Sequence, residues 1–303
     1  MEVLWVFLKI GDGDFKRGFS QTQVEIKFDT NLNQPNPKQL ETELPAVPEI
    51  ENTYQGWKKI YSQLVDRNNR GFKKVQISNV SRESCLEHNT SLQSQLNQWL
   101  LPIKSLLESV ITPNTNYDIS LVVNTHSVTS ESVKNILHRL PWHECNLVGE
   151  NSSLEVALCF NDSSPPTRKP NSDNFRRIKI ISIFGDSTNI NTSKYEELII
   201  DLEKRGTDID FLKQPKREEL DKLLDVTDCD VLFYSGHSYS LESGKKGIIS
   251  LNDNESLDLE EISGTLQSLI DKAGLQLAFF NSSDGLGLAR FLINLNLLIL
   301  LVI

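Results

Sequence analysis

Two short polar segments each follow an apolar run that predicts a β-strand, and both carry side chains that could take part in catalysis. Gly236-His237-Ser238 follows the run CDVLFYS, and Ser282-Ser283-Asp284-Gly285 follows the run QLAFFN. An imidazole can act as a general base near neutral pH. Free backbone amides and the dipole at the start of a helix stabilise an anionic nucleophile or an oxyanion. The candidate site therefore pairs His237 with the hydroxyl groups of the second segment.

Each segment also has a structural interpretation. A single histidine after a strand is more often a loop residue than a catalyst, and Ser and Asp are common N-caps of helices. In open α/β sheets, however, functional groups collect in the loops just past the carboxyl ends of the strands. Both segments satisfy that rule, and their joint occurrence favours a functional site.

The pattern of the second half of the chain is typical of an α/β domain. Continuous apolar strands separated by amphipathic helices predict a mostly parallel sheet that is covered on both faces. Strands are expected at 177–184, 208–212, 229–235, 247–251 and 276–281. Helices are expected at 194–204, 216–225, 258–270 and 286–293, and the apolar run 291–303 is expected to be a helix end followed by a buried strand.

The first half of the chain predicts a mixed α+β region. Apolar runs at 3–10 and 19–28 flank Gly11-Asp12-Gly13-Asp14, and because glycine tolerates the positive φ of tight turns, a β-hairpin is expected there. A polar, Pro-marked loop is expected from 31 to 48. The remaining elements expected are a helix from Pro48, a helix from 86 to 107 that Pro102 kinks or divides, strands at 119–124 and 154–160, and a short helix at 133–140.

A change of composition separates these halves. The stretch from 161 to 174, which includes SSPPTRKPNSDN, is dense in Pro, Ser and Asn and cannot bury enough apolar surface to order itself. The sequence therefore predicts an N-terminal α+β region at 1–160, a linker at 161–175 and an α/β domain at 176–303.

Composition and charge exclude several classes of function. With 31 basic and 41 acidic side chains the net charge is −10, which argues against a nucleic acid as the main ligand, because binding to phosphates needs a basic surface. The longest uncharged apolar run, 291–303, is shorter than the roughly 20 residues that a membrane-spanning helix requires. Neither a nucleic-acid partner nor a membrane is expected, and the oligomeric state is left open.

The four cysteines are far apart and form no CxxC pair. This spacing indicates neither a disulfide framework nor a structural metal site, and free thiols are typical of the reducing cytoplasm. A zinc site at His138, His143, Glu144 and Cys145 is not favoured, because Pro141 interrupts the helical spacing of such ligands. No cofactor and no metal are expected.

Both polar segments resemble the catalytic motifs of bacterial CHAT-domain proteins, which belong to the superfamily of caspase-like cysteine peptidases. In that family a strand running into Gly-His supplies the general base, and a later strand running into FNSCDGLGLA supplies a thiol nucleophile. The corresponding stretches here are FYSGHS at 233–238 and FFNSSDGLGLAR at 279–290. Upstream, HRLPWHE at 138–144 and GDFKRGF at 13–19 resemble segments of one bacterial subgroup.

The resemblance implies a caspase-like, mostly parallel sheet and the chemistry of a peptide hydrolase. It assigns His237 as general base, Ser283 to the position of the nucleophile, and Gly236, Ser282, Asp284 and Gly285 to support of the oxyanion and the loops. It further implies cleavage after a basic residue. The resemblance also predicts further strands and helices after residue 303, so the domain at 176–303 is expected to be incomplete at its C-terminus.

One departure from the family pattern changes the expected activity. Ser283 stands where the family has Cys, and a hydroxyl ionises far less readily than a thiol with a pKa of about 8.5. Serine catalysis usually needs a histidine oriented by a carboxylate, and the sequence identifies no acid for His237. The expected function is an inactive peptidase homologue that binds peptides or proteins. The alternatives are an active endopeptidase that uses His237 and Ser283 to cleave after basic residues, and a non-functional truncated gene product.

Overall fold

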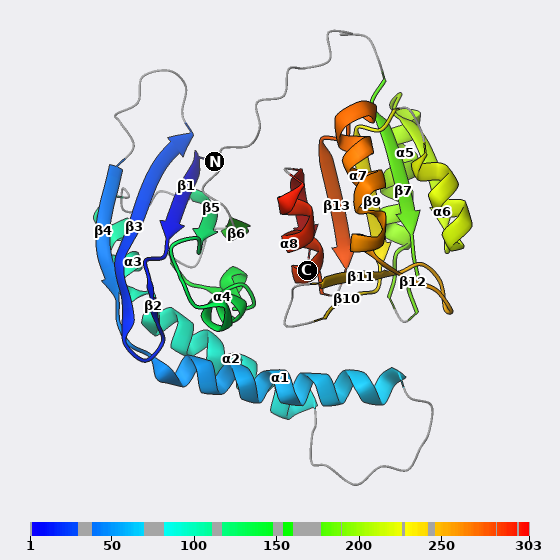
Figure 1. The fold of residues 1–303 in the computed structure, drawn as a ribbon. Coiled ribbons are helices and arrows are strands. Elements are labelled where there is room, and N and C mark those ends of the chain that lie inside the picture. The colour runs from blue at the N-terminus through cyan, green and yellow to red at the C-terminus, as the bar shows by residue number, and fades with distance from the viewer. Residues whose placement is uncertain are drawn as a thin grey trace. The chain divides into compact units, whose positions relative to one another are not determined.

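In a computed structural model the chain divides into two compact units, Met1–Asp162 and Ser163–Ile303 (Figure 1). The structure describes residues 2–29, 38–69, 82–110, 117–147, 154–159, 177–188, 190–225, 228–241, 246–282, 284–295 and 297–302. The linker predicted at 161–175 lies outside these residues, and the division between the units falls within it. The two units are therefore described one at a time.

The first unit contains a mixed sheet, six-stranded within the described residues, in the order β2-β3-β1-β5-β6 with β4 on the outer side of β3. β1 pairs antiparallel with β3 and parallel with β5, and β5 pairs parallel with β6. The strands are β1 (Glu2–Lys9), β2 (Gly13–Asp14), β3 (Gly18–Asp29), β4 (Lys38–Leu44), β5 (Tyr117–Asn124) and β6 (Leu154–Cys159).

The expected hairpin is present, but the prediction that its turn lies at 11–14 was wrong. Gly13 and Asp14 form the short strand β2, which pairs with Gly18 and Phe19, so the chain reverses at 15–17. The Asp14 carboxylate accepts hydrogen bonds from the backbone amides of Lys16 and Arg17 and closes the turn. Gly18 has a φ of 88°, a conformation that favours glycine. The position of the turn is thus set by the hydrogen bonds that the Asp14 side chain accepts and by the positive φ of Gly18.

The loop predicted from 31 to 48 was wrong for residues 38–44, which form β4; residues 31–37 lie outside the described part of the chain. β4 pairs antiparallel with β3, with Leu40 opposite Val24. Its sequence KQLETEL alternates, but only Leu40 and Leu44 are apolar and the other side chains are polar. A polar strand at the edge of a sheet carries little of the apolar signal by which strands are recognised.

Four α-helices accompany this sheet within the described residues: α1 (Pro48–Asn69), α2 (Arg82–Trp99), α3 (Leu101–Glu108) and α4 (Glu131–Leu137), with a 3-10 turn at Trp142–Glu144. The prediction that Pro102 divides the second helix is confirmed. α2 ends at Trp99 and α3 begins at Leu101, with the proline in its first turn, where no amide donor is needed.

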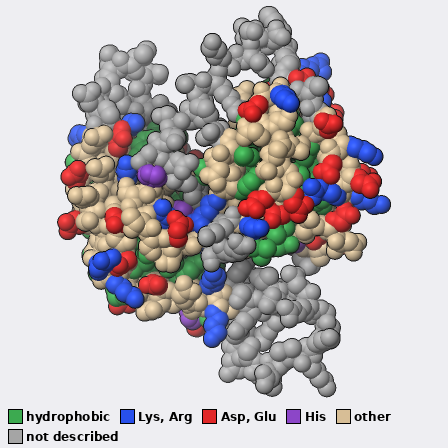
Figure 2. Space-filling model, in the orientation of Figure 1, with side chains coloured by type: hydrophobic (Ala, Val, Ile, Leu, Met, Phe, Trp, Pro, Cys, Tyr) green, Lys and Arg blue, Asp and Glu red, His purple; other side chains and the backbone are tan. Residues whose placement is uncertain are grey.

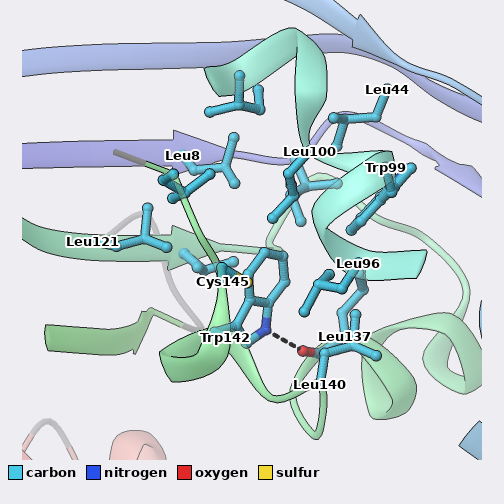
Figure 3. Packing of buried hydrophobic residues seen from close by; sticks show 14 of the residues in the cluster. Leu8, Leu44, Leu96, Trp99, Leu100, Leu121, Leu137, Leu140, Trp142 and Cys145 are labelled. Carbon is cyan, nitrogen blue, oxygen red and sulfur yellow. Dashed lines mark hydrogen bonds between the residues drawn. The ribbon is translucent and has the colours of Figure 1, made fainter. Parts of the chain in front are cut away.

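Tryptophans anchor the core of the first unit. Trp99 of α2 is fully buried, and its ring centroid lies 6.2 Å from that of Trp142 and 5.6 Å from that of Phe15. The Trp142 indole donates a 2.7 Å hydrogen bond to the Leu137 carbonyl, which ties the HRLPWHE segment to the end of α4. Figure 3 shows this bond, with Trp142 lying among the buried apolar side chains of the sheet and α2. The resembling segment at 138–144 therefore has a packing role.

The second unit is an α/β domain whose five-stranded sheet is entirely parallel, in the order β14-β13-β9-β7-β8. Its strands are β7 (Lys179–Phe184), β8 (Asp208–Lys213), β9 (Val231–Gly236), β13 (Leu277–Ser282) and β14 (Leu298–Val302). Its helices within the described residues are α5 (Ser193–Lys204), α6 (Arg217–Leu224), α7 (Ser263–Ser268) and α8 (Leu286–Asn294).

Helices cover both faces of this sheet, as expected (Figure 1). Leu220 of α6, Leu266 of α7 and Leu288 of α8 pack against the face that bears Tyr234 and Phe280. The opposite face bears Ile180, Phe184 and Phe233, on which Ile199 of α5 packs. The parallel sheet is thus an internal layer whose carboxyl edge is left for loops.

A small antiparallel sheet was not expected. The strand predicted at 247–251 does not join the parallel sheet but forms β11 (Lys246–Ser250), between β10 (Ser238–Leu241) and β12 (Ser256–Asp258). β10 begins directly after His237, and with only four residues it has no periodic signal of its own. The segment after His237 is therefore a strand and not an open loop.

The helix predicted at 258–270 consists of three pieces, a 3-10 turn at Leu259–Ile262, α7, and a π-helical turn at Leu269–Ala273. Within the described residues, no helix is both long enough and apolar enough to cross a membrane.

On the face in view in Figure 2, acidic and basic side chains lie interspersed, with a row of carboxylates over the second unit.

We expect Trp99→Ala to destabilise the first unit by about 3–5 kcal/mol, because it leaves a large cavity among buried side chains. All four tryptophans lie at positions 5, 57, 99 and 142, so urea unfolding followed by tryptophan fluorescence reports on this unit alone. Trp5→Ala is the control, because Trp5 is 39% exposed and its loss should cost about 1 kcal/mol or less. Equal losses for the two variants would contradict this description of the core.

Candidate functional site

The two polar segments lie at the ends of neighbouring strands. β9 and β13 pair in parallel, and Gly236 at the end of β9 is the register partner of Ser282 at the end of β13. His237 follows Gly236 directly, and Asp284 and Gly285 lead into α8. Ser283 lies outside the described residues. The structure thus brings together Gly236, His237, Ser282, Asp284 and Gly285 at the carboxyl edge of the parallel sheet.

The imidazole of His237 is held by one hydrogen bond from a defined ring nitrogen. Its Nε2 lies 2.8 Å from the carbonyl oxygen of Thr188. A carbonyl oxygen only accepts hydrogen bonds, so Nε2 must carry the proton. The lone pair of the neutral ring is then on Nδ1, which is the atom able to take up a proton from a nucleophile.

The backbone of His237 is fixed on both sides. Its amide donates to the Asp186 carbonyl at 2.7 Å, and its carbonyl accepts from the Ser250 amide at 2.9 Å. The Tyr234 hydroxyl donates to the same carbonyl at 2.6 Å. Burial raises the pKa of that hydroxyl well above its ordinary value, so it remains protonated and keeps donating. His237 is therefore a rigidly placed residue and not part of a loose loop.

A third loop, at 185–188, completes the site and was missed by the sequence analysis. Asp186 and Thr188 follow β7, whose last residue, Phe184, is the register partner of Ser235 in β9. Oδ1 of Asp186 accepts from the Thr188 amide at 3.0 Å and from the Thr188 hydroxyl at 2.7 Å. The signal was available, because Gly185-Asp186-Ser187-Thr188 is a polar segment just past a predicted strand, like the two segments that were chosen.

The sequence offered no acid for His237, and the structure places the Asp186 carboxylate in the loop whose Thr188 carbonyl accepts from the imidazole. Burial alone would raise its pKa, but the hydrogen bonds from Thr188 and the nearby His237 outweigh burial and hold the pKa below its ordinary value. The carboxylate is therefore charged at neutral pH. Its hydrogen bonds go to Thr188, so it reaches the imidazole through the Thr188 carbonyl.

Asp284 fastens the second loop to β10. Its Oδ1 accepts from the Ser240 hydroxyl at 2.8 Å and its Oδ2 from the Ser240 amide at 3.1 Å. The Ser238 hydroxyl donates to the Asp284 carbonyl at 2.9 Å. Because β10 continues directly from His237, these bonds tie the segment that leads into α8 to the strand that begins at the histidine.

The N-capping interpretation of the second segment is wrong for Asp284. The N-cap of α8 is Gly285, which has no side-chain cap. The Ser240 hydroxyl instead accepts from the Gly287 amide in the first turn of α8, at 2.9 Å. A serine from a neighbouring strand thus satisfies an amide that would otherwise lack a partner at the helix start.

Close packing explains the glycine before His237. A Cβ atom at Gly236 would lie 2.8 Å from the Tyr234 hydroxyl and 2.9 Å from the Asp186 carbonyl. Glycine at this position is therefore what lets the 185–188 loop approach β9 closely enough to reach the imidazole.

Ser282 lies below the edge of the sheet. It is 7% exposed, and its hydroxyl has no hydrogen-bond partner among the described residues. Its burial alternates in step with Ala278 and Phe280, which places it on the face covered by α7 and α8.

Among the described residues, no three His, Cys, Asp or Glu side chains are grouped so that they could hold a metal ion. His143 lies 3.7 Å from Glu144 at the surface. Burial raises the pKa of the Cys145 and Cys229 thiols to about 12, so both remain neutral and neither is an activated nucleophile.

In comparisons with known proteins, neither a family model nor a curated protein matches the chain.

We expect Gly236→Ala to destabilise the second unit by about 1–3 kcal/mol, because the added methyl group overpacks the contact with Asp186. Hydrogen exchange measured by mass spectrometry on peptides from β9 and β13 reads the effect. Gly264→Ala is the control, since a Cβ atom there meets nothing within 4 Å and alanine favours the helix by up to about 1 kcal/mol. Equal protection in the two variants would contradict the close approach.

We expect Ser240→Ala to loosen the loop before α8, because it removes the hydroxyl that donates to Oδ1 of Asp284 and accepts from the Gly287 amide, at a cost of about 1–3 kcal/mol. Faster hydrogen exchange should appear in peptides that cover 284–290. Ser256→Ala, an exposed serine in β12, should leave the same peptides unchanged. Unchanged exchange in Ser240→Ala would show that these bonds do not hold the loop.

Proposed function

We propose that the chain is a degenerate, caspase-like peptidase homologue of the CHAT group that binds a peptide or protein partner without hydrolysing it. The observation that carries the proposal is the register of Gly236 with Ser282, which sets the Gly-His motif beside the NSSDG motif. The oriented imidazole of His237 supports it, because Nδ1 is the nitrogen left to act as a base. A caspase-like arrangement of the sheet is part of the proposal.

The proposal excludes efficient hydrolysis because of Ser283. A thiol beside an imidazole is readily deprotonated, whereas a hydroxyl needs a histidine that a carboxylate orients and whose positive charge it stabilises. Asp186 does not orient the imidazole by a direct bond of this kind, because the hydrogen bond of the ring goes to the Thr188 carbonyl and the bonds of Asp186 Oδ1 go to Thr188. The base is therefore in place, but the nucleophile is too weak for it.

The partner class follows from charge. An acidic chain attracts basic peptides and repels nucleic acid, and Asp186 and Asp284 add two carboxylates at the carboxyl edge of the sheet. We propose a basic peptide or a basic protein segment as the ligand, bound in the cytoplasm without a cofactor, metal, nucleic acid or membrane.

A second candidate function is slow hydrolysis by Ser283 itself, cleaving after a basic residue. The observation that favours it is the charged Asp186 beside His237, which supplies part of what serine catalysis requires. The peptide hydrolysis and binding assay described next separates the two candidates.

We expect Ser283→Cys to restore hydrolysis of fluorogenic peptides that carry Arg or Lys before the reporter, because it supplies a thiol that the oriented imidazole of His237 can deprotonate. The wild-type chain should bind the same peptides, measured by fluorescence polarisation, without releasing the reporter. Turnover should be lost again when His237→Gln is added to Ser283→Cys.

Turnover by the wild-type chain that Ser283→Ala abolishes would replace the first candidate by the second. Absence of both peptide binding by the wild type and turnover by Ser283→Cys would overturn the proposed function.

A further inference from the structure

We propose that Asp186 is the positioning residue of this site: it holds the Thr188 carbonyl where that carbonyl fixes the proton of His237 on Nε2. The inference rests on the proposed function only in that it concerns the same site. It adds a residue that lies outside the Gly-His and NSSDG motifs, and it assigns that residue a task of its own.

The first step of the argument is that one loop holds His237 at two points. The His237 amide donates to the Asp186 carbonyl at 2.7 Å, and the ring Nε2 donates to the Thr188 carbonyl at 2.8 Å. Two attachments to residues only two positions apart fix both the backbone and the plane of the ring. The direction of the imidazole is therefore as rigid as the 186–188 turn itself.

The second step is that the rigidity of this turn depends on one carboxylate oxygen. Oδ1 of Asp186 accepts both the amide and the hydroxyl of Thr188, at 3.0 and 2.7 Å. Such Asx turns replace a backbone turn by a side-chain acceptor. Thr188 is exposed, so little packing holds it, and without Oδ1 its carbonyl would be free to rotate away from the ring.

The third step concerns the choice of ring nitrogen. A neutral imidazole exchanges its proton between Nδ1 and Nε2 unless an acceptor favours one of them. The Thr188 carbonyl is such an acceptor for Nε2. By holding that carbonyl, Asp186 keeps the lone pair on Nδ1, the ring nitrogen that is left to act as a base.

The charge of Asp186 contributes separately. The nearby His237 is one of the causes that hold the pKa of the Asp186 carboxyl below its ordinary value, so the carboxylate is charged beside the ring. Asparagine keeps an oxygen able to accept from Thr188 but has no charge. The two contributions can therefore be separated by substitution.

The test is the tautomer of His237, read from long-range proton–nitrogen NMR spectra of the full chain with labelled histidine. The His237→Gln spectrum assigns the signal among the five histidines. We expect Nε2 to be protonated in the wild type and in Asp186→Asn, and a mixture of tautomers in Asp186→Ala. Asp201→Asn, which removes an exposed carboxylate that pairs with Arg205, is the control and should match the wild type.

A folded Asp186→Ala variant with the wild-type tautomer would overturn the inference, and so would a wild-type ring protonated on Nδ1. Should Asp186→Ala fail to fold, Thr188→Val decides, because it removes only the hydroxyl donor. A shift toward the mixture supports the inference, and an unchanged ring overturns it. This readout needs no turnover, so it stands apart from failure of the proposed function.

A second readout uses the restored enzyme. In the Ser283→Cys background, Asp186→Ala should lower kcat by about 100-fold with little change in KM, because a misaligned base affects the chemical step more than binding. Asp186→Asn should lose less than Asp186→Ala, since it keeps the acceptor. Equal losses would show that charge alone, and not the position of the Thr188 carbonyl, is what Asp186 contributes.

Discussion

The parallel pairing of β9 with β13 is the constraint on which the site depends. Hydrogen bonds between the strands set Gly236 opposite Ser282, and a shift by one residue would move every side chain of β13 to the other face. That shift would turn Phe280 away from the apolar cluster in which it is buried and put Asn281 in its place. The register is therefore fixed by burial of the apolar side chains of β9 and β13, and this pairing sets the positions of the polar loops that follow the two strands.

Three loops then become one structure because each is bound to a neighbour. The 185–188 loop is bound to His237, and β10, which continues from His237, is bound to Asp284. The Tyr234 hydroxyl connects the segment at His237 to β11, since it donates to the His237 carbonyl and lies 3.0 Å from the Ser250 carbonyl. The bonds between Asp284 and Ser240 involve neither the imidazole nor the hydroxyl of Ser283. The link between β10 and the loop before α8 is therefore made by residues other than the proposed reacting pair.

The order of the strands and helices that form the parallel layer could be predicted because most of these strands are apolar runs and the helices between them have an apolar face. β10 could not be predicted, because it is only four residues long. What distinguishes it is the pair of hydrogen bonds from Ser238 and Ser240 to Asp284, which the sequence does not reveal. β4 was missed for a related reason, as a polar edge strand has few apolar residues. Asp186 stands in a polar segment just past a predicted strand, so its loop could have been chosen from the sequence. Its link to His237 through Thr188 is a tertiary contact with no fixed sequence spacing, and that part could not be predicted.

Exchange of Cys for Ser at position 283 would leave such a framework standing. The two side chains differ by one atom, and the contacts that hold the edge belong to Gly236, Tyr234, Ser240 and Asp284. Catalysis depends on the acidity of the nucleophile, whereas binding depends on the shape and charge of the edge. Hydrolysis could therefore be lost through one atom while the proposed binding site persists, because the bonds of Tyr234, Ser240 and Asp284 do not depend on which atom carries the nucleophile.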